Sequence, residues 1–162
     1  MKIGIVAGLR REVKFFKDHK NHLIINGYSN ESTKVTKELL KKKIDLIVSF
    51  GFAASLCKSA KTGDIVIPKK IMNASGLSYN ANSMYSGLFK KKIKKKIFTQ
   101  NLFTSSEIEN HLDKQKMRTK KQNNLFSFVD MEAVHICKVA TENKIPFIAI
   151  KIIFDDVDFN IP

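Results

Sequence analysis

Short apolar runs of strand length recur along the 162-residue chain and alternate with stretches of helical periodicity. The runs that predict strands cover residues 2–7, 22–27, 44–50, 63–71, 97–103, 126–130 and 145–153. The continuous run 44–50 indicates a strand buried on both faces, as in a parallel sheet, and Gly51 is expected to end it. Pro68 predicts an edge or a bulge at the far end of the strand 63–71.

Helical spacing of apolar residues appears between these runs and predicts helices over 10–18, 33–43 and 131–143. Asn30, Glu31 and Ser32 provide capping chemistry before the second helix. Ser105 and Ser106 are expected to cap a polar helix that reaches about Lys116, followed by a loop over 117–124. The alternation of strands and helices predicts an α/β fold with a mostly parallel sheet, formed by residues 1–162 as one domain.

The net charge of +14 comes from 29 basic and 15 acidic residues, and it invites a nucleic-acid interpretation. All but three of the basic residues are Lys, whereas base and phosphate recognition favours the planar fork of Arg. We therefore expect a solvated basic surface and no specific nucleic-acid partner. The run Lys90–Lys96 is expected to be a solvated loop or a strand edge protected by Lys, and a Lys-rich nucleic-acid-binding module remains the alternative.

Several other classes of protein fit the sequence poorly. No apolar run approaches the roughly 20 residues that span a bilayer, and the first residues lack the apolar core of a signal peptide. Cys57 and Cys137 stand apart, and none of the four His residues has the spacing of a metal ligand. His135 is expected to pack on its helix or cap it. We expect a soluble, cytoplasmic protein without a metal and without integral membrane association.

Carboxylates follow several of the predicted strands. Glu12 comes after the first strand, Glu132 after 126–130, and Asp155 and Asp156 after 145–153. Since ligands of open α/β sheets bind outside the carboxyl ends of the strands, these acids are candidates for general acid–base chemistry. Taken singly, each acid is better explained as a helix-cap or surface residue, because Glu12 and Glu132 fall in first helical turns, where acids are favoured.

Three segments of the chain match sequence motifs of a known family, and they occur in the same order. They read MKIGIVAGLRREV at 1–13, VSFGFAASLCKSAKTGDIVIP at 48–68 and FVDMEAVHICKVATENKIPFIAIKIIFD at 128–155. The chain resembles the nucleoside phosphorylase/nucleosidase superfamily, most closely its methylthioadenosine/S-adenosylhomocysteine nucleosidase and hopanoid-associated phosphorylase branches. The resemblance covers nearly the whole chain, with a looser match over 72–125. It implies a three-layer phosphorylase/hydrolase-like fold, a mostly parallel mixed sheet flanked by helices.

The same resemblance implies an enzyme that cleaves the N-glycosidic bond of a purine nucleoside, with adenine as the expected base. Glu12 corresponds to the acid that activates the nucleophile, and Asp155 to the acid that assists departure of the base. Glu132, with Met131, corresponds to the residues that hold the ribose hydroxyls. Further substrate contacts are implied for Gly51, Phe52, Ala53 and Phe154. The partner implied is a small-molecule nucleoside.

The chain departs from the family pattern at several positions. Phe52 stands where the family usually has Ser or Thr, Phe154 where it often has Ser, and Lys151 where it often has Arg. The two Phe side chains either line a more apolar pocket or indicate that the active site has decayed. A catalytically degenerate nucleoside-binding or scaffold homologue is therefore the main alternative to an enzyme.

The sequence also gives expectations for the attacking nucleophile and for the oligomeric state. The segment 27–30 carries no Arg where many phosphorylases have one, so hydrolysis is favoured over phosphorolysis. No cofactor is expected, with phosphate as co-substrate only for a phosphorylase. The sequence runs seven residues past Asp155, so we expect the family's C-terminal helix to be absent. A homo-oligomer, with a dimer favoured, would then cover the exposed face of the sheet.

Overall fold

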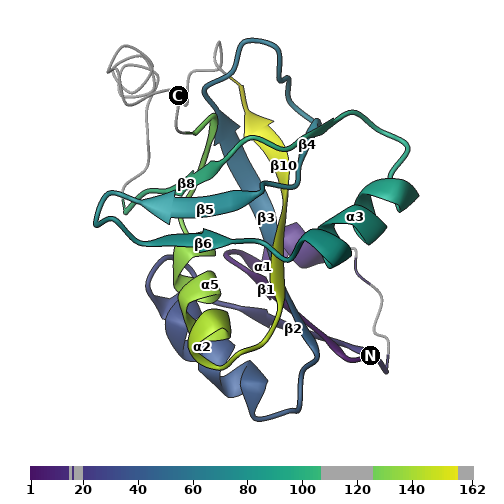
Figure 1. The fold of residues 1–162 in the computed structure, drawn as a ribbon, viewed down its shortest axis with the longest axis vertical. Coiled ribbons are helices and arrows are strands. Elements are labelled where there is room, and N and C mark those ends of the chain that lie inside the picture. Colours follow the sequence, from purple (N-terminus) through teal and green to yellow (C-terminus); the bar gives the residue numbers. More distant parts are fainter. Residues whose placement is uncertain (15, 17–19, 107–125, 157–162) are drawn as a thin grey trace.

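The computed structural model describes residues 1–14, 16, 20–106 and 126–156 (Figure 1). The strands are β1 (Ile3–Ala7), β2 (His22–Asn26), β3 (Leu46–Ser55), β4 (Ile65–Val66), β5 (Lys70–Asn73), β6 (Ser78–Asn80), β7 (Ile97–Phe98), β8 (Leu102–Thr104), β9 (Phe128–Asp130) and β10 (Phe147–Asp155). The helices are α1 (Arg10–Val13), α2 (Glu31–Leu40), α3 (Ser83–Lys92) and α5 (Ala133–Glu142).

All of these strands belong to one ten-stranded sheet. The main path runs β6-β5-β8-β9-β3-β10-β4-β7. β1 pairs with residues 46–50 of β3, on the edge that β9 occupies at residues 54–55, and β2 pairs with β1. Within the described residues, six of the nine strand pairings are parallel and three are antiparallel. The predicted mostly parallel mixed sheet is confirmed.

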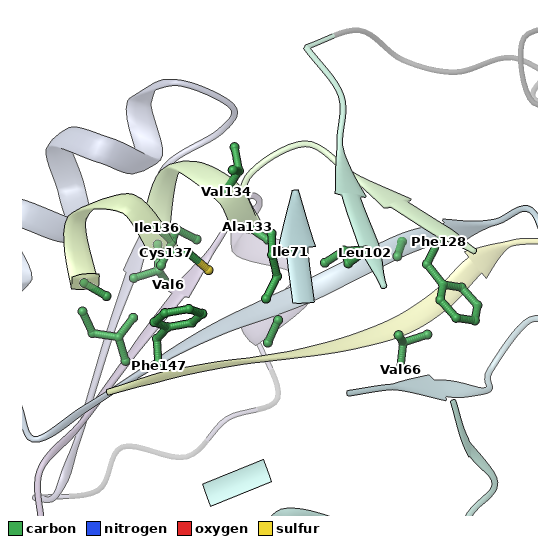
Figure 2. Close-up of a cluster of buried hydrophobic side chains, with 14 of the residues drawn as sticks. Val6, Val66, Ile71, Leu102, Phe128, Ala133, Val134, Ile136, Cys137 and Phe147 are labelled. Carbon is green, nitrogen blue, oxygen red and sulfur yellow. The ribbon is translucent and has the colours of Figure 1, made fainter. Parts of the chain in front are cut away.

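Helices cover both faces of the sheet, which gives the predicted three-layer α/β architecture. On one face, α2 and α5 lie side by side (Figure 1) and pack over a large apolar cluster that includes Val6, Phe128 and Ile136 (Figure 2). On the other face, Val13 of α1 is buried in a second cluster, and side chains of α3 pack against that cluster. β1 and β10 run parallel to β3, whereas β9 runs antiparallel to it, so the carboxyl ends of β1 and β9 face each other beside the middle of β3.

Three predicted strands differ from the observed ones in where they end or break. Gly51 does not end the third strand, because β3 continues through it to Ser55 with a Gly51 φ of +150°. The predicted strand 63–71 is two strands: β4 pairs with β10 and β7, whereas β5 pairs with β6 and β8. Pro68 lies between them and has no N–H to donate to a continuous ladder. The run 97–103 is likewise divided into β7 and β8.

The predicted helices differ from the observed ones in length and in capping. Within the described residues, α1 ends at Val13, and the rest of the predicted helix 10–18 lies largely outside those residues. The second predicted helix, 33–43, begins two residues earlier, as α2. Asn30 is its N-cap residue but makes no side-chain capping bond; instead, the Ser32 hydroxyl donates to the carbonyl of Ser29 at 2.6 Å.

Helix α3 was not predicted, and it changes the interpretation of the basic run. Lys90, Lys91 and Lys92 form the last turn of α3, where positive charge is favoured, so the prediction of a loop or strand edge is wrong for that half of the run. The helix expected between Ser105 and about Lys116, the loop 117–124 and the chain beyond residue 156 lie outside the described residues.

Candidate active site

Glu12 is held at the end of β1 by two backbone amides. It is the third residue of α1, and its Oε2 accepts the N–H of Leu9, the residue that precedes the helix, at 2.7 Å. Its Oε1 accepts the N–H of Phe52, in the middle of β3, at 2.9 Å. One carboxylate therefore connects the β1–α1 turn to the neighbouring strand. Each oxygen retains a lone pair, so the group can still accept a proton or a water hydrogen bond.

Gly51 makes this approach possible. A Cβ atom on Gly51 would lie 2.7 Å from Oε1 of Glu12, closer than real Cβ contacts allow. The Gly51 φ of +150° is also a conformation that residues with side chains rarely adopt. The sequence predicted that Gly51 ends the strand, but Gly51 lies inside β3, at the point where the Glu12 carboxylate approaches it. The two residues are therefore in contact.

Glu132 approaches the end of β1 from the other side. A Cβ atom on Gly8 would lie 2.8 Å from its Oε1, and the same oxygen lies 3.4 Å from the N–H of Ser29, which donates to it. Burial raises the pKa of Glu132, and the charges of Asp130 and Glu12 raise it further, whereas Lys151 and the Ser29 N–H lower it. Glu132 and Glu12 therefore lie close enough to influence each other at one edge of the site.

Met131, beside Glu132, lies against the β2–α2 loop. The hydroxyl of Tyr28 donates to Sδ of Met131 at 3.0 Å, and Tyr28 is itself exposed. The contact joins two segments 103 residues apart in the chain and brings the loop 27–30 to the edge of the site.

Asp130 is the last residue of β9, two positions before Glu132, and it forms a buried network. Its Oδ1 accepts the Thr104 hydroxyl at 2.7 Å, and its Oδ2 accepts the Ala133 N–H at 2.9 Å. Lys151 Nζ lies 2.8 Å from the same Oδ2, with side chains exposed by 1% for Lys151 and 0% for Asp130. The Thr104 hydroxyl in turn accepts the N–H of Val134 at 3.0 Å. These bonds join β8, β9, β10 and the start of α5.

The Lys151 ammonium interacts electrostatically with three acids of the site. Burial by itself lowers the pKa of Lys151, but the negative charges of Asp130, Glu132 and Glu12, with the hydrogen bond to Asp130, raise it overall. The side chain therefore stays charged in a buried position. Sequence reasoning noted Lys151 only as a departure from the family pattern. Its signal was a charged residue within the apolar strand 145–153.

Asp155 ends β10, and two aromatic rings lie beside it. The Asp155 side chain is buried, and its backbone is in register with Ala54 after an irregularity in the β3–β10 pairing. The rings of Phe52 and Phe154 have centroids 5.1 Å apart at an interplanar angle of 36°. Phe154 remains 49% exposed, so this aromatic pair reaches the molecular surface.

The candidate residues thus fall into three places. Glu12, Gly51 and the Phe52 amide are in contact, whereas Glu132 and Met131 lie across Gly8 at the β9–α5 turn. Asp155 and Phe154 end β10, the strand next to β3. Ala53 is buried in the larger apolar cluster, which leaves its backbone as the part available to a ligand.

Three residues of the network were missed at the sequence level as parts of the site: Thr104, Asp130 and Lys151. His135 is half-buried, and burial lowers its pKa. In the described part of the chain, His, Cys, Asp and Glu side chains form no group of three or more that could hold a metal ion. No helix among the described residues is long and apolar enough to cross a membrane.

The fold and the site together indicate an enzyme of the α/β class, with carboxylates at the carboxyl ends of several strands. A profile of the phosphorylase superfamily matches residues 22–160, and the chain belongs to that superfamily. The resemblance noted from the sequence is confirmed, and with it the assignment to enzymes of the nucleosidase and nucleoside phosphorylase type.

Curated relatives support the same assignment. The chain is 30% identical over 202 residues to the 5′-methylthioadenosine/S-adenosylhomocysteine nucleosidase of Buchnera aphidicola subsp. Acyrthosiphon pisum, covering 99% of this chain and 87% of the relative. It is 26% identical over 204 residues to the enzyme of the same name from Buchnera aphidicola subsp. Baizongia pistaciae, covering 98% of this chain and 80% of the relative.

Solved structures share the fold at low sequence identity. A 5′-methylthioadenosine/S-adenosylhomocysteine nucleosidase from Colwellia psychrerythraea 34H, solved in complex with adenine, matches with a TM-score of 0.84 at 18% identity, covering 98% of this chain and 84% of the other. Futalosine hydrolase of Helicobacter pylori matches with a TM-score of 0.79 at 18% identity, covering 96% and 84%.

Proposed function

We propose that this protein hydrolyses the N-glycosidic bond of an adenine nucleoside. The observation that carries the proposal is the meeting of Glu12 and Glu132 at the end of β1, each approaching a glycine that leaves room for its carboxylate. The names of the curated relatives support methylthioadenosine and S-adenosylhomocysteine as the substrates to test first. The free base released would then be adenine.

Glu12 is proposed to activate the attacking water. Its two backbone hydrogen bonds fix the position of the carboxylate and leave lone pairs directed away from the amides. A general base requires this kind of fixed geometry, because proton transfer needs the acceptor within hydrogen-bond reach of the nucleophile. No metal or cofactor has a part in this proposal.

Glu132 is proposed to hold the ribose hydroxyls, with Met131 contacting the sugar beside it. A carboxylate can accept hydrogen bonds from two vicinal hydroxyls, and these bonds strengthen as positive charge develops on the ring in an oxocarbenium-like transition state. The raised pKa of Glu132 gives this interaction a pH dependence, because the protonated acid cannot accept both bonds.

Asp155 is proposed to assist departure of the base by donating a proton or hydrogen bond to N7 of the purine. Its place at the end of β10, beside the strand that carries the Phe52 amide, supports a position across the substrate from Glu12. The arrangement follows the logic of glycoside hydrolysis, with an acid at the leaving group and an activated water on the sugar.

Water is favoured over phosphate as the nucleophile. Phosphate binding requires Arg, hydroxyl groups or a set of backbone amides that face the anion. The loop 27–30 contains no Arg, and in that loop the Ser29 N–H donates to Glu132 and the Tyr28 hydroxyl to Met131. If phosphate were the nucleophile, it would be a co-substrate in the same site.

The test is an assay for free adenine. The purified protein is incubated with methylthioadenosine, S-adenosylhomocysteine or adenosine, with and without phosphate. We expect adenine release without phosphate and a loss of at least about 100-fold in kcat/KM for Glu12→Gln and Asp155→Asn. Glu31→Gln, at the start of α2, is the matched control, because it also removes one carboxylate but lies outside the proposed site. Release that is unchanged in Glu12→Gln, Glu132→Gln and Asp155→Asn would overturn the assigned roles.

The second candidate function is a nucleoside-binding homologue without turnover. The Phe52–Phe154 pair favours it, because two aromatic rings occupy positions where the family often has hydroxyl groups. It predicts that adenine or adenosine raises the melting temperature of the protein while no free base is formed.

A further inference from the structure

Glu132 occupies the N-cap position of α5 but does not cap the helix. The first turn of an α-helix has N–H groups without intrahelical partners, and a polar side chain at the N-cap position normally accepts one of them. The Glu132 side chain makes no such bond. Its Oε1 lies instead beside Gly8 and the Ser29 N–H, on the side of the candidate site.

Two other side chains accept these N–H groups in its place. Asp130, at the end of β9, accepts the Ala133 N–H at 2.9 Å, and Thr104, at the end of β8, accepts the Val134 N–H at 3.0 Å. Thr104 and Asp130 are joined to each other by the 2.7 Å bond from the Thr104 hydroxyl to Oδ1. The first turn of α5 is therefore capped from two strand ends.

Lys151 completes the arrangement. Its Nζ lies 2.8 Å from Oδ2 of Asp130, the oxygen that also accepts the Ala133 N–H. A buried carboxylate is tolerated when it has a paired cation and hydrogen bonds. Lys151 therefore allows Asp130 to remain a charged cap in a position closed to water.

We propose that Thr104 and Asp130 are positioning residues for Glu132: they cap α5 in its place and so leave its carboxylate directed at the ribose. Neither residue contacts the substrate in this proposal. Without the Thr104 hydroxyl, the Val134 N–H loses its acceptor, and we expect the Glu132 carboxylate, which stands at the N-cap position, to turn toward that N–H and away from the sugar. The inference rests on the proposed function, because that function assigns Glu132 to the ribose. Whether the Glu132 side chain turns toward the helix or stays beside Gly8 can be observed without that function.

The decisive variant is Thr104→Val, which keeps the shape of the side chain and removes the hydroxyl. We expect KM for methylthioadenosine to rise about tenfold with a smaller change in kcat, because a lost ribose hydrogen bond weakens binding by that order. Thr104→Ser keeps the hydroxyl and should restore KM to within about twofold of wild type. The crystal structure of Thr104→Val should have a Glu132 carboxylate oxygen within hydrogen-bond distance of the Val134 N–H, the group that Thr104 no longer binds.

Thr36→Val is the matched control. Thr36 is buried, as Thr104 is, but its hydroxyl donates to the Ser32 carbonyl within α2. It should lower the melting temperature without raising KM, which separates a loss of stability from a loss of positioning.

A KM of Thr104→Val within about twofold of wild type, or an equal rise in Thr36→Val, would overturn the inference. If the wild-type protein releases no adenine, the proposed function fails, and the orientation of Glu132 in the Thr104→Val crystal structure decides the inference alone. A side chain that stays beside Gly8 there would refute it.

Discussion

The carboxylate of Glu12 lies where a side chain on Gly51 would lie. A Cβ at position 51 would be 2.7 Å from Oε1 of Glu12, and the φ of Gly51 is +150°. Gly51→Ala should therefore displace Glu12 and add conformational strain of roughly 1–3 kcal/mol. Since a displacement of about 1 Å can cost about 100-fold in rate, we expect kcat/KM for adenine release to fall by that order.

Gly76→Ala separates these two effects. Gly76 also has a positive φ, of +80°, but no atom lies within 4 Å of the position that its Cβ would take. This control should lose stability in urea unfolding while it keeps the activity of wild type. Equal activity losses in Gly51→Ala and Gly76→Ala would contradict a specific contact between Gly51 and Glu12.

The raised pKa of Glu132 predicts a pH-dependent stability. Because the folded protein holds the Glu132 proton more tightly than the unfolded chain, this group's contribution to stability is complete below its ordinary pKa of 4.5. The contribution is lost as the pH rises through the raised folded pKa. Glu132→Gln cannot ionise, so it should be more stable than wild type at pH 7.5 and lose that advantage at pH 4. Urea unfolding of both proteins at the two pH values measures the difference, and an equal difference at both would contradict it.

Removal of one member of the Lys151–Asp130 pair should be far more costly than removal of both. Lys151→Met leaves the Asp130 carboxylate buried without its cation, which costs about 3–5 kcal/mol in free energy of unfolding. Adding Asp130→Asn removes the remaining charge and should recover part of that loss. The raised pKa of Lys151 means that the pair's contribution persists through pH 10.5 and is lost only as the pH rises through the folded pKa.

The control for this pair is a solvent-exposed one. Lys41 and Glu38 form a salt bridge of the same 2.8 Å length on α2, with both side chains more than half exposed. Lys41→Met should change the free energy of unfolding little, because water screens exposed pairs. A loss in Lys151→Met no larger than that in Lys41→Met, both measured by urea unfolding at pH 7, would contradict the importance of the buried pair.

The sequence predicts best those elements that bury a continuous apolar run. β1 and β10 are found within two residues of their expected bounds, because strands buried on both faces require such runs. β2, which is half-buried at every position, is found within one residue of its expected bounds. Helix α3 was missed since SMYSGLFKKK contains Gly and has little helical segregation of apolar and polar residues. Its local signal was Asn82, whose Oδ1 accepts the Tyr85 N–H as a helix cap.

The candidate site was only partly predictable for a related reason. The rule that ligands bind at the carboxyl ends of strands found Glu12 and Glu132, since each closely follows a predicted strand. The same rule could not identify Thr104 or Lys151 as parts of the site. The hydrogen-bond network of Thr104, Asp130 and Lys151 joins β8, β9 and β10 through contacts that only the folded sheet creates. In the sequence, this network was indicated only by Lys151, a cation within the otherwise apolar predicted strand 145–153.

The aromatic pair at the end of β10 gives the last prediction. Phe154 is 49% exposed, and its ring lies 5.1 Å from that of Phe52, the residue whose N–H binds Glu12. If Phe154 contacts the adenine or its sugar, Phe154→Ser should raise KM several-fold, because aromatic contacts contribute about 0.5–1.5 kcal/mol beyond burial. The folded state should lose little, since half of the ring already faces water. Leu88→Ser, at a comparably exposed apolar position on α3, is the control and should leave KM unchanged. A KM in Phe154→Ser equal to that of Leu88→Ser would place the substrate away from Phe154, and the aromatic pair would then have no part in binding.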